Sequence, residues 1–206
     1  MHVLIGTTNP SKIQRFADLL KDCGVEFVTL SDLKIEEEPE ETGKTPEENA
    51  IIKAEFYGRF FDRVICNDSG LYFEELALSD ERQPGLHVRT PLGGKRLNDE
   101  EMIDYYAKLA AALGGKVTAY YLDGIAVYNQ GKISSFMDEK LAKETGSFYM
   151  VEKPSEKRQE GWPLDSLSKY KDNDNYFVDN GNESKENIIT GEYEKRIIEF
   201  LKAALV

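Results

Sequence analysis

Cysteine and histidine are both scarce in this sequence of 206 residues. The two cysteines, Cys23 and Cys66, are too few for a disulfide framework and form no CxxC pair. We therefore expect two reduced thiols, as is usual in cytoplasmic proteins. The two histidines, His2 and His87, stand far apart in no HxxxH pattern, so a zinc site is not predicted. A GxSxG elbow is also missing, which argues against a Ser-His-Asp hydrolase.

Long hydrophobic runs are missing as well. No segment approaches the ~18 consecutive apolar residues of a transmembrane helix. The apolar run near the N-terminus, in MHVLIGTTNP, stops at Gly6 and follows no basic region, so it does not resemble a signal peptide. These features together predict a cytoplasmic location.

Basic residues are outnumbered. The chain has 26 Lys and Arg against 38 Asp and Glu, a formal net charge of −12. This balance argues against a nucleic-acid partner, which needs a basic face, and against binding to anionic membranes. It does not exclude a small anionic ligand held by a metal ion and a few local cations.

What the sequence does contain is sufficient for a folded core, with 40% hydrophobic and 11% aromatic residues. Strands and helices alternate in the first third, whereas strands dominate the middle, which predicts an α/β fold with a mixed sheet. No linker is evident, so we expect one domain, residues 1–206, with two lobes. The predicted strands are 3–5, 26–30, 63–66, 116–128 and 133–137, with a hairpin loop at 129–132 between the last two, and the segment 168–186 is expected to be a loop. The predicted helices start at Pro10, Pro46, Asp99 and Glu192; a capping box is predicted over 45–48, and Asn98 is a predicted N-cap.

The first strand, loop and helix are a candidate phosphate site. A helix N-terminus presents free N–H groups and a partial positive charge, and Lys12 adds a full charge in the first turn. The loop is not a Walker A motif, because GxxxxGK[ST] is missing. An ordinary helix capped by Asn9, with Pro10 at its first position, is the alternative.

Acidic residues and a lysine form two further candidates. Asp68 lies in the run Asn67-Asp68-Ser69-Gly70, directly after the predicted strand 63–66. Its carboxylate could hold a hard cation or act as a base toward water. The alternative is that Asp68 only forms a turn at the end of the strand. Glu41 precedes the helix 46–60 that carries Lys53, and together they could bridge a metal and a phosphate chain. The alternatives are a solvated acidic loop, 36–41, and a surface lysine.

The only tryptophan marks a fourth candidate, Gly161-Trp162-Pro163-Leu164-Asp165. Trp162 could stack on a planar base while Asp165 accepts hydrogen bonds from it. A tryptophan buried in the core is the alternative.

Several segments, taken in order, resemble motifs of one enzyme family. The first segment, IGTTNPSKIQRFADLL, resembles a T-G-N-x-x-K phosphate loop and the helix after it. The second, EETGKTPEENAIIKA, resembles an E-E-T-G-x-T-x-x-E-N-A-x-x-K-A motif. The third, ICNDSGL, resembles a D-D-S-G-L motif. PGLHVR resembles a P-G-x-Y segment. The family is that of the inosine triphosphate pyrophosphatases, which remove non-canonical purine nucleoside triphosphates from the nucleotide pool. The resemblance is strongest over residues 3–90.

The resemblance implies a fold, an activity and a set of residues. The fold is an elongated mixed sheet flanked by helices, with two lobes and a central cleft, and members are usually homodimers. The activity is Mg²⁺-dependent hydrolysis of a nucleoside triphosphate to monophosphate and pyrophosphate. Glu41 and Asp68 would bind Mg²⁺, with Asp68 also the general base and Lys53 stabilising the phosphates. The implied substrate-binding residues are Thr7, Thr8, Asn9, Pro10, Ser11, Lys12, Lys53, Ser69 and Arg89.

The sequence departs from the family pattern at the base end. Asn67 replaces the first Asp of D-D-S-G, and G-F-G-Y-D-P becomes GWPLDS, in which Trp162 and Asp165 remain candidates for the base. Lys185 aligns with a family lysine, but Thr190 and Gly191 stand where the family has His-Arg. Two alternatives therefore stay open: the same phosphate chemistry with a different base preference, and a nucleotide-binding protein that no longer hydrolyses its ligand.

Overall fold

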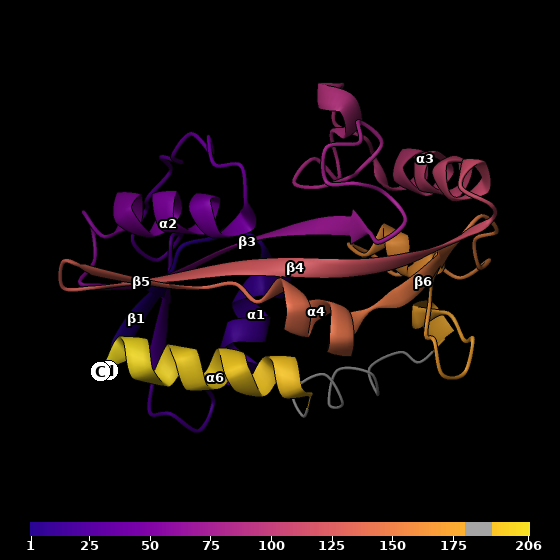
Figure 1. Ribbon diagram of the computed structural model, residues 1–206. Helices are drawn as coiled ribbons and strands as arrows, with labels where there is room; N and C mark the ends of the chain where they lie inside the picture. Colours follow the sequence, from indigo (N-terminus) through magenta and orange to yellow (C-terminus); the bar gives the residue numbers. More distant parts are fainter. Residues whose placement is uncertain (180–190) are drawn as a thin grey trace. The chain divides into compact units, whose positions relative to one another are not determined.

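The computed structural model describes residues 1–179 and 191–206, which contain seven strands and five α-helices (Figure 1). The strands are β1 (His2–Ile5), β2 (Glu26–Thr29), β3 (Arg63–Phe73), β4 (Lys116–Asn129), β5 (Lys132–Phe136), β6 (Phe148–Val151) and β7 (Ser168–Lys169). The helices are α1 (Pro10–Leu19), α2 (Pro46–Tyr57), α3 (Asp99–Ala112), α4 (Glu139–Gly146) and α6 (Glu192–Leu205). Short 3₁₀ turns occupy Pro91–Gly93, Pro163–Ser166 and Phe177–Asp179.

The strands form one mixed sheet in the order β2-β1-β3-β4-β6-β7, with β5 also paired to β4. β1 lies parallel to both β2 and β3, whereas β4 is antiparallel to β5 and β6. Gln130 and Gly131, both with positive φ, form the tight turn between β4 and β5. The predicted mixed α/β fold and the predicted hairpin are confirmed.

Local capping explains where the helices begin. The Asn9 side chain accepts a hydrogen bond from the Ser11 N–H at 2.9 Å, and Thr45 Oγ1 accepts one from the Glu48 N–H at 3.1 Å. The Glu48 carboxylate, however, reaches the Lys44 N–H and not Thr45, so the predicted capping box is only half formed. The predicted end of this helix near Phe60 was too late, because α2 ends at Tyr57.

The predicted end of the third strand at Cys66 was wrong. β3 continues to Phe73, so Asn67, Asp68, Ser69 and Gly70 lie inside a strand and not in a turn. The pairing with β1 does stop at Ile65, which lies opposite Ile5, but β4 pairs with β3 on its other edge and keeps the backbone extended. Polar residues can continue a strand when a neighbour supplies its hydrogen bonds.

The chain divides into two compact units. Unit 1 comprises residues 1–69, 122–139 and 189–206, of which 189 and 190 lie outside the described part. Its strands bury alternate residues on opposite faces, as the period of two requires. Ile5 and Ile65 pack with α1 and α6, whereas Leu4 and Cys66 pack with α2. Helices therefore cover both faces of this part of the sheet (Figure 1).

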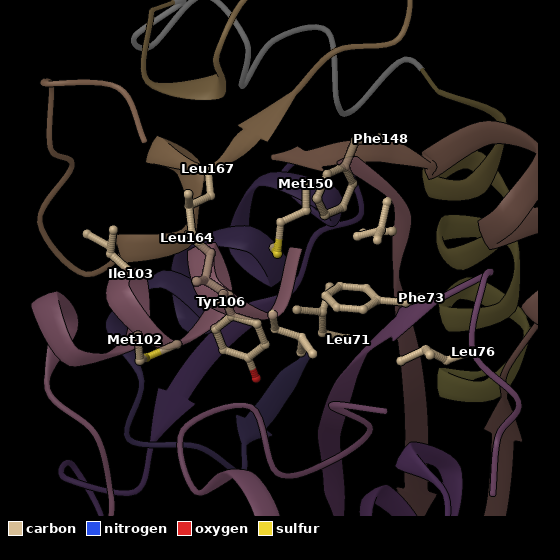
Figure 2. Packing of buried hydrophobic residues seen from close by; sticks show 13 residues of the cluster. Leu71, Phe73, Leu76, Met102, Ile103, Tyr106, Phe148, Met150, Leu164 and Leu167 are labelled. Carbon is tan, nitrogen blue, oxygen red and sulfur yellow. The ribbon is translucent and has the colours of Figure 1, made fainter. Parts of the chain in front are cut away.

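Unit 2 comprises residues 70–121 and 140–188, described to 179. Its core joins β3, β4 and β6 to α3 and to the 3₁₀ turn at Pro163–Ser166 (Figure 2). Tyr106 on α3 is fully buried in this cluster and donates its hydroxyl to the Val88 carbonyl at 2.9 Å. That bond satisfies the polar end of a buried aromatic side chain.

Two elements have no counterpart among the predicted ones, namely α4 and β6. The segment 168–186, expected to be a loop, contains the short strand β7 and a 3₁₀ turn in its described part. Among the described helices, none is long and apolar enough to cross a membrane. Both cysteines are free thiols, as expected.

Candidate functional site

Lys53 stands between two carboxylates in unit 1. Its Nζ lies 3.1 Å from Glu41 Oε1 and 3.7 Å from Asp68 Oδ1. The Lys53 and Asp68 side chains are only 12% and 15% exposed, whereas Glu41 is 44% exposed. One ammonium thus reaches both predicted metal ligands, so the structure brings together the three charged residues of the second and third motifs.

Asn49 fixes the orientation of Asp68. Its Nδ2 donates to Asp68 Oδ2 at 2.9 Å, and its own Oδ1 accepts from the Gly43 N–H at 2.8 Å. Asn49 is 3% exposed, so both bonds are shielded from water. Sequence reasoning assigned Asn49 no role, although its position four residues before Lys53 on one helical stripe was the available signal.

β3 explains why Asp68 points toward Lys53. Side chains alternate along the strand, so Asp68 shares a face with Val64 and Cys66, which pack against α2. β1 has already ended at this level, since Ile5 is its last residue. Asp68 therefore lies beyond the carboxyl end of the parallel β1–β3 pairing, which is where α/β sheets place ligands.

The predicted phosphate loop links β1 to α1. Thr7 Oγ1 accepts a hydrogen bond from the Asn9 N–H at 3.2 Å. Burial and the neighbouring Lys53 ammonium lower the pKa of Lys12, while Asp68, Asp123 and Glu41 act in the opposite direction. Lys12 and Lys53 thus belong to one electrostatic cluster, a local concentration of positive charge in an acidic protein.

Gly6 makes the close approach of this loop to the sheet feasible. Its N–H donates to the Ile65 carbonyl at 2.9 Å, and a Cβ at this position would collide with Cys66 Sγ and with the Tyr57 ring. Cys66 is 1% exposed and belongs to the core cluster packed against α2, and burial raises the pKa of its thiol to about 12.

Of the remaining candidate positions, Arg89, Trp162 and Asp165 belong to unit 2 and Gly191 belongs to unit 1. Arg89 Nη1 is paired with Asp99 at 2.9 Å. Trp162 is 43% exposed, so the alternative of a tryptophan buried in the core is wrong. Burial raises the pKa of Asp165 to about 6. Lys185 and Thr190 lie outside the described residues, and Gly191 is the residue before α6.

The acidic pair has the right donor chemistry for a divalent cation. Mg²⁺ is usually bound by one or two protein carboxylates, with water and phosphate oxygens completing its shell. Glu41 and Asp68 supply two carboxylates close enough to share the Lys53 ammonium. Among the described residues no group of three or more acidic, histidine or cysteine side chains could enclose a metal. The donor set fits an ion that is shared with a phosphate ligand.

Known proteins resemble this chain in sequence and in fold. A family model described as the Ham1 family matches residues 3–190. The chain is 37% identical over 142 residues to a dITP/XTP pyrophosphatase of Thermoanaerobacter pseudethanolicus, covering 68% of this chain and 69% of the relative. It is 27% identical over 186 residues to a Bacillus subtilis protein of the same name, covering 90% and 88%. A HAM1 protein from Coxiella burnetii shares the fold, with a TM-score of 0.74, 20% identity and coverage of 98% and 97%.

The fold and the charge cluster define a class: an α/β protein in which one lysine of a helix lies between two carboxylates. The chain belongs to the Ham1 family, since the family model covers most of its length. The resemblance to the inosine triphosphate pyrophosphatases, first evident in three motifs, is confirmed.

Proposed function

We propose that this protein hydrolyses non-canonical purine nucleoside triphosphates to monophosphate and pyrophosphate, and so removes these triphosphates from the nucleotide pool. The observation that carries the proposal is the placement of the Lys53 ammonium between Glu41 and Asp68, with Asp68 oriented by Asn49. The names of its relatives, dITP/XTP pyrophosphatases, support the same substrate class.

The cationic residues would bind and position the triphosphate. Lys12 and the partial positive charge at the start of α1 attract phosphate oxygens, and Thr7, Thr8, Asn9 and Ser11 add hydrogen-bonding groups beside Pro10. Lys53 stabilises charge that develops on the phosphate chain. Ser69, the next residue along β3, would bind substrate beside Asp68.

Asp68 would act as the general base. Asn49 donates a hydrogen bond to Asp68 Oδ2. The other oxygen, Oδ1, lies 3.7 Å from Lys53 Nζ and would take a proton from the attacking water. Glu41 and Asp68 would hold Mg²⁺. The bound ion would neutralise phosphate charge. Most of the rate enhancement would then come from positioning and electrostatics.

The proposal also assigns contacts for the base end of the ligand. Trp162, Asp165 and Lys185 are its candidate contacts, and Arg89, now paired with Asp99, is a further candidate for substrate binding. Because Thr190 and Gly191 replace the family His-Arg, a base preference other than inosine or xanthine is the alternative. A cytoplasmic homodimer of one two-lobed domain, with no nucleic-acid or membrane partner, completes the proposal.

A specific observation favours a second candidate, a nucleotide-binding protein without turnover. Asn67 stands where the family has an acid, and its Oδ1 is buried without a hydrogen-bond partner among the described residues. An acid at this position could contribute to metal or water handling, which an amide cannot do in the same way.

A panel of triphosphates tests both candidates. Purified protein is incubated with ITP, XTP, dITP and the four canonical triphosphates, with Mg²⁺ or with EDTA, and pyrophosphate release is followed. Mg²⁺-dependent release from ITP, XTP or dITP supports the first proposal. Calorimetric binding of a nucleotide without any release supports the second, and absence of both binding and release refutes both.

A further inference from the structure

A nearly buried ion-pair network in unit 1 is centred on α1, the helix that follows the predicted phosphate loop. Arg15 on α1 contacts two carboxylates with separate nitrogens: Nη1 lies 2.8 Å from Asp123 Oδ2, and Nη2 lies 2.9 Å from Glu194 Oε1. The acidic side chains are 10% and 9% exposed, and that of Arg15 is 27% exposed. The network ties α1 to β4 and α6, three elements far apart in the sequence.

Asp123 forms an ion pair with one cation of α1 and acts electrostatically on a second. Arg15 and Lys12 are three residues apart on α1 and therefore lie on the same side of the helix. The Asp123 carboxylate acts on both: it is the ion-pair partner of Arg15, and its field also raises the pKa of Lys12 against the larger effects of burial and of Lys53. Among the ion pairs of the described residues, none includes Lys12.

Glu194 adds a second negative charge to the same region. Its Oε2 is buried and has no hydrogen-bond partner within the described part of the chain. Burial therefore raises the pKa of Glu194, which the Arg15 charge partly opposes. Without Arg15, two carboxylates would lie unpaired in a poorly hydrated place next to the phosphate loop.

We propose that Arg15 is a positioning residue for triphosphate binding: by neutralising Asp123 and Glu194 it keeps the Lys12 ammonium free for the anionic ligand. If Asp123 were not held by Arg15, the nearest cation on α1 for it would be Lys12, and an ion pair there would compete with phosphate. Arginine suits the role because its planar fork pairs with two carboxylates at once, which a single ammonium on a shorter stem does less well.

The proposal rests on the proposed function only in taking the ligand to be a triphosphate. Its test uses inorganic tripolyphosphate, which has no base and needs no turnover. Binding to the full chain is measured by calorimetry in MgCl₂ for the wild type and for Arg15→Lys, Asp123→Asn and the double variant. Arg196→Met, which removes an exposed arginine that pairs with Glu199 at 3.4 Å, is the control.

We expect Arg15→Lys to raise the Kd for tripolyphosphate about fivefold to tenfold. In the double variant, the additional Asp123→Asn change should return the Kd to within about twofold of the wild-type value. A purely structural role would give the opposite pattern, because the double variant loses more contacts than the single one. A thermal unfolding curve for each variant shows that it is folded. Arg196→Met should bind like the wild type.

Wild-type affinity in Arg15→Lys, or a double variant that binds no better than Arg15→Lys, would overturn the proposal. So would a wild type that binds no tripolyphosphate. Failure of the proposed function is a separate result: a wild type that binds tripolyphosphate but releases no pyrophosphate from any nucleotide refutes the hydrolase, while the variant series still decides the role of Arg15.

Discussion

Asn49 Nδ2 donates a hydrogen bond to Asp68 Oδ2 at 2.9 Å, and this contact joins the helix that carries Lys53 to the strand that carries the proposed base. Because Asn49 also accepts from the Gly43 N–H, it connects three segments of the site. A buried amide with both ends satisfied holds a carboxylate in one rotamer far better than water would.

Replacing Asn49 with Ala should lower kcat more than it lowers affinity for the triphosphate. The change frees Asp68 to rotate and leaves the Gly43 N–H without its acceptor, and loss of such a supporting contact commonly costs about 10- to 100-fold in activity. Steady-state kinetics with the best substrate of the panel measure the effect. Asn173→Ala, in an exposed loop, is the matched control, and equal kinetics for the two variants would contradict the assigned role.

Replacing Glu41 with Gln should raise the Mg²⁺ concentration needed for half-maximal activity by about tenfold, because one of two charged ligands is lost. The measurement is a Mg²⁺ titration at saturating nucleotide. Glu37→Gln, four residues earlier in the same acidic loop and exposed, should leave the titration unchanged. If both variants shift alike, the general charge of the loop and not Glu41 binds the metal.

Gly6→Ala should destabilise the fold and disturb the phosphate loop. The added methyl group would lie 2.8 Å from the Tyr57 ring and also collide with Cys66, and such overpacking typically costs about 1–3 kcal/mol. Chemical denaturation gives the free energy of unfolding. Gly146→Ala is the control, since nothing lies within 4 Å of a Cβ there. Equal losses in the two variants would show that the loop tolerates the methyl group.

Stability should depend on pH through Asp165. Burial raises the pKa of Asp165 to about 6 from the usual 3.8, so between these values the folded protein holds a proton that the unfolded chain has lost. The free energy of unfolding therefore falls as pH rises from about 4 to 6, by roughly 1–2 kcal/mol from this residue.

In Asp165→Asn, the free energy of unfolding should not show the decrease between about pH 4 and 6 that Asp165 causes in the wild type. The stability of the variant relative to the wild type should be higher at pH 7 than at pH 4 by about the same 1–2 kcal/mol, measured by urea denaturation at both values. Asp172→Asn, an exposed aspartate in the same unit, should show no such difference. A pH-independent difference for Asp165→Asn would mean that its carboxyl titrates normally.

Features that depend on near neighbours in the chain could be predicted from the sequence. The caps at Asn9, Thr45 and Asn98 start their helices as expected, because a cap needs only a side chain and an N–H two or three residues away. The hairpin turn at Gln130-Gly131 is equally local. The end of β3 was wrong because its continuation depends on pairing with β4, more than forty residues further along the chain.

The sequence by itself predicted the mixed α/β class from the order of its expected strands and helices. It also indicated the family, and with it the candidate residues Lys12, Glu41, Lys53 and Asp68, through motifs that resemble those of the family. Only the tertiary structure showed that Lys53 reaches both Glu41 and Asp68, that Asn49 orients Asp68, and that Arg15 holds Asp123 and Glu194. The physical reason is that ion pairs and buried hydrogen bonds depend on distances of 3 to 4 Å between residues that can be more than a hundred positions apart.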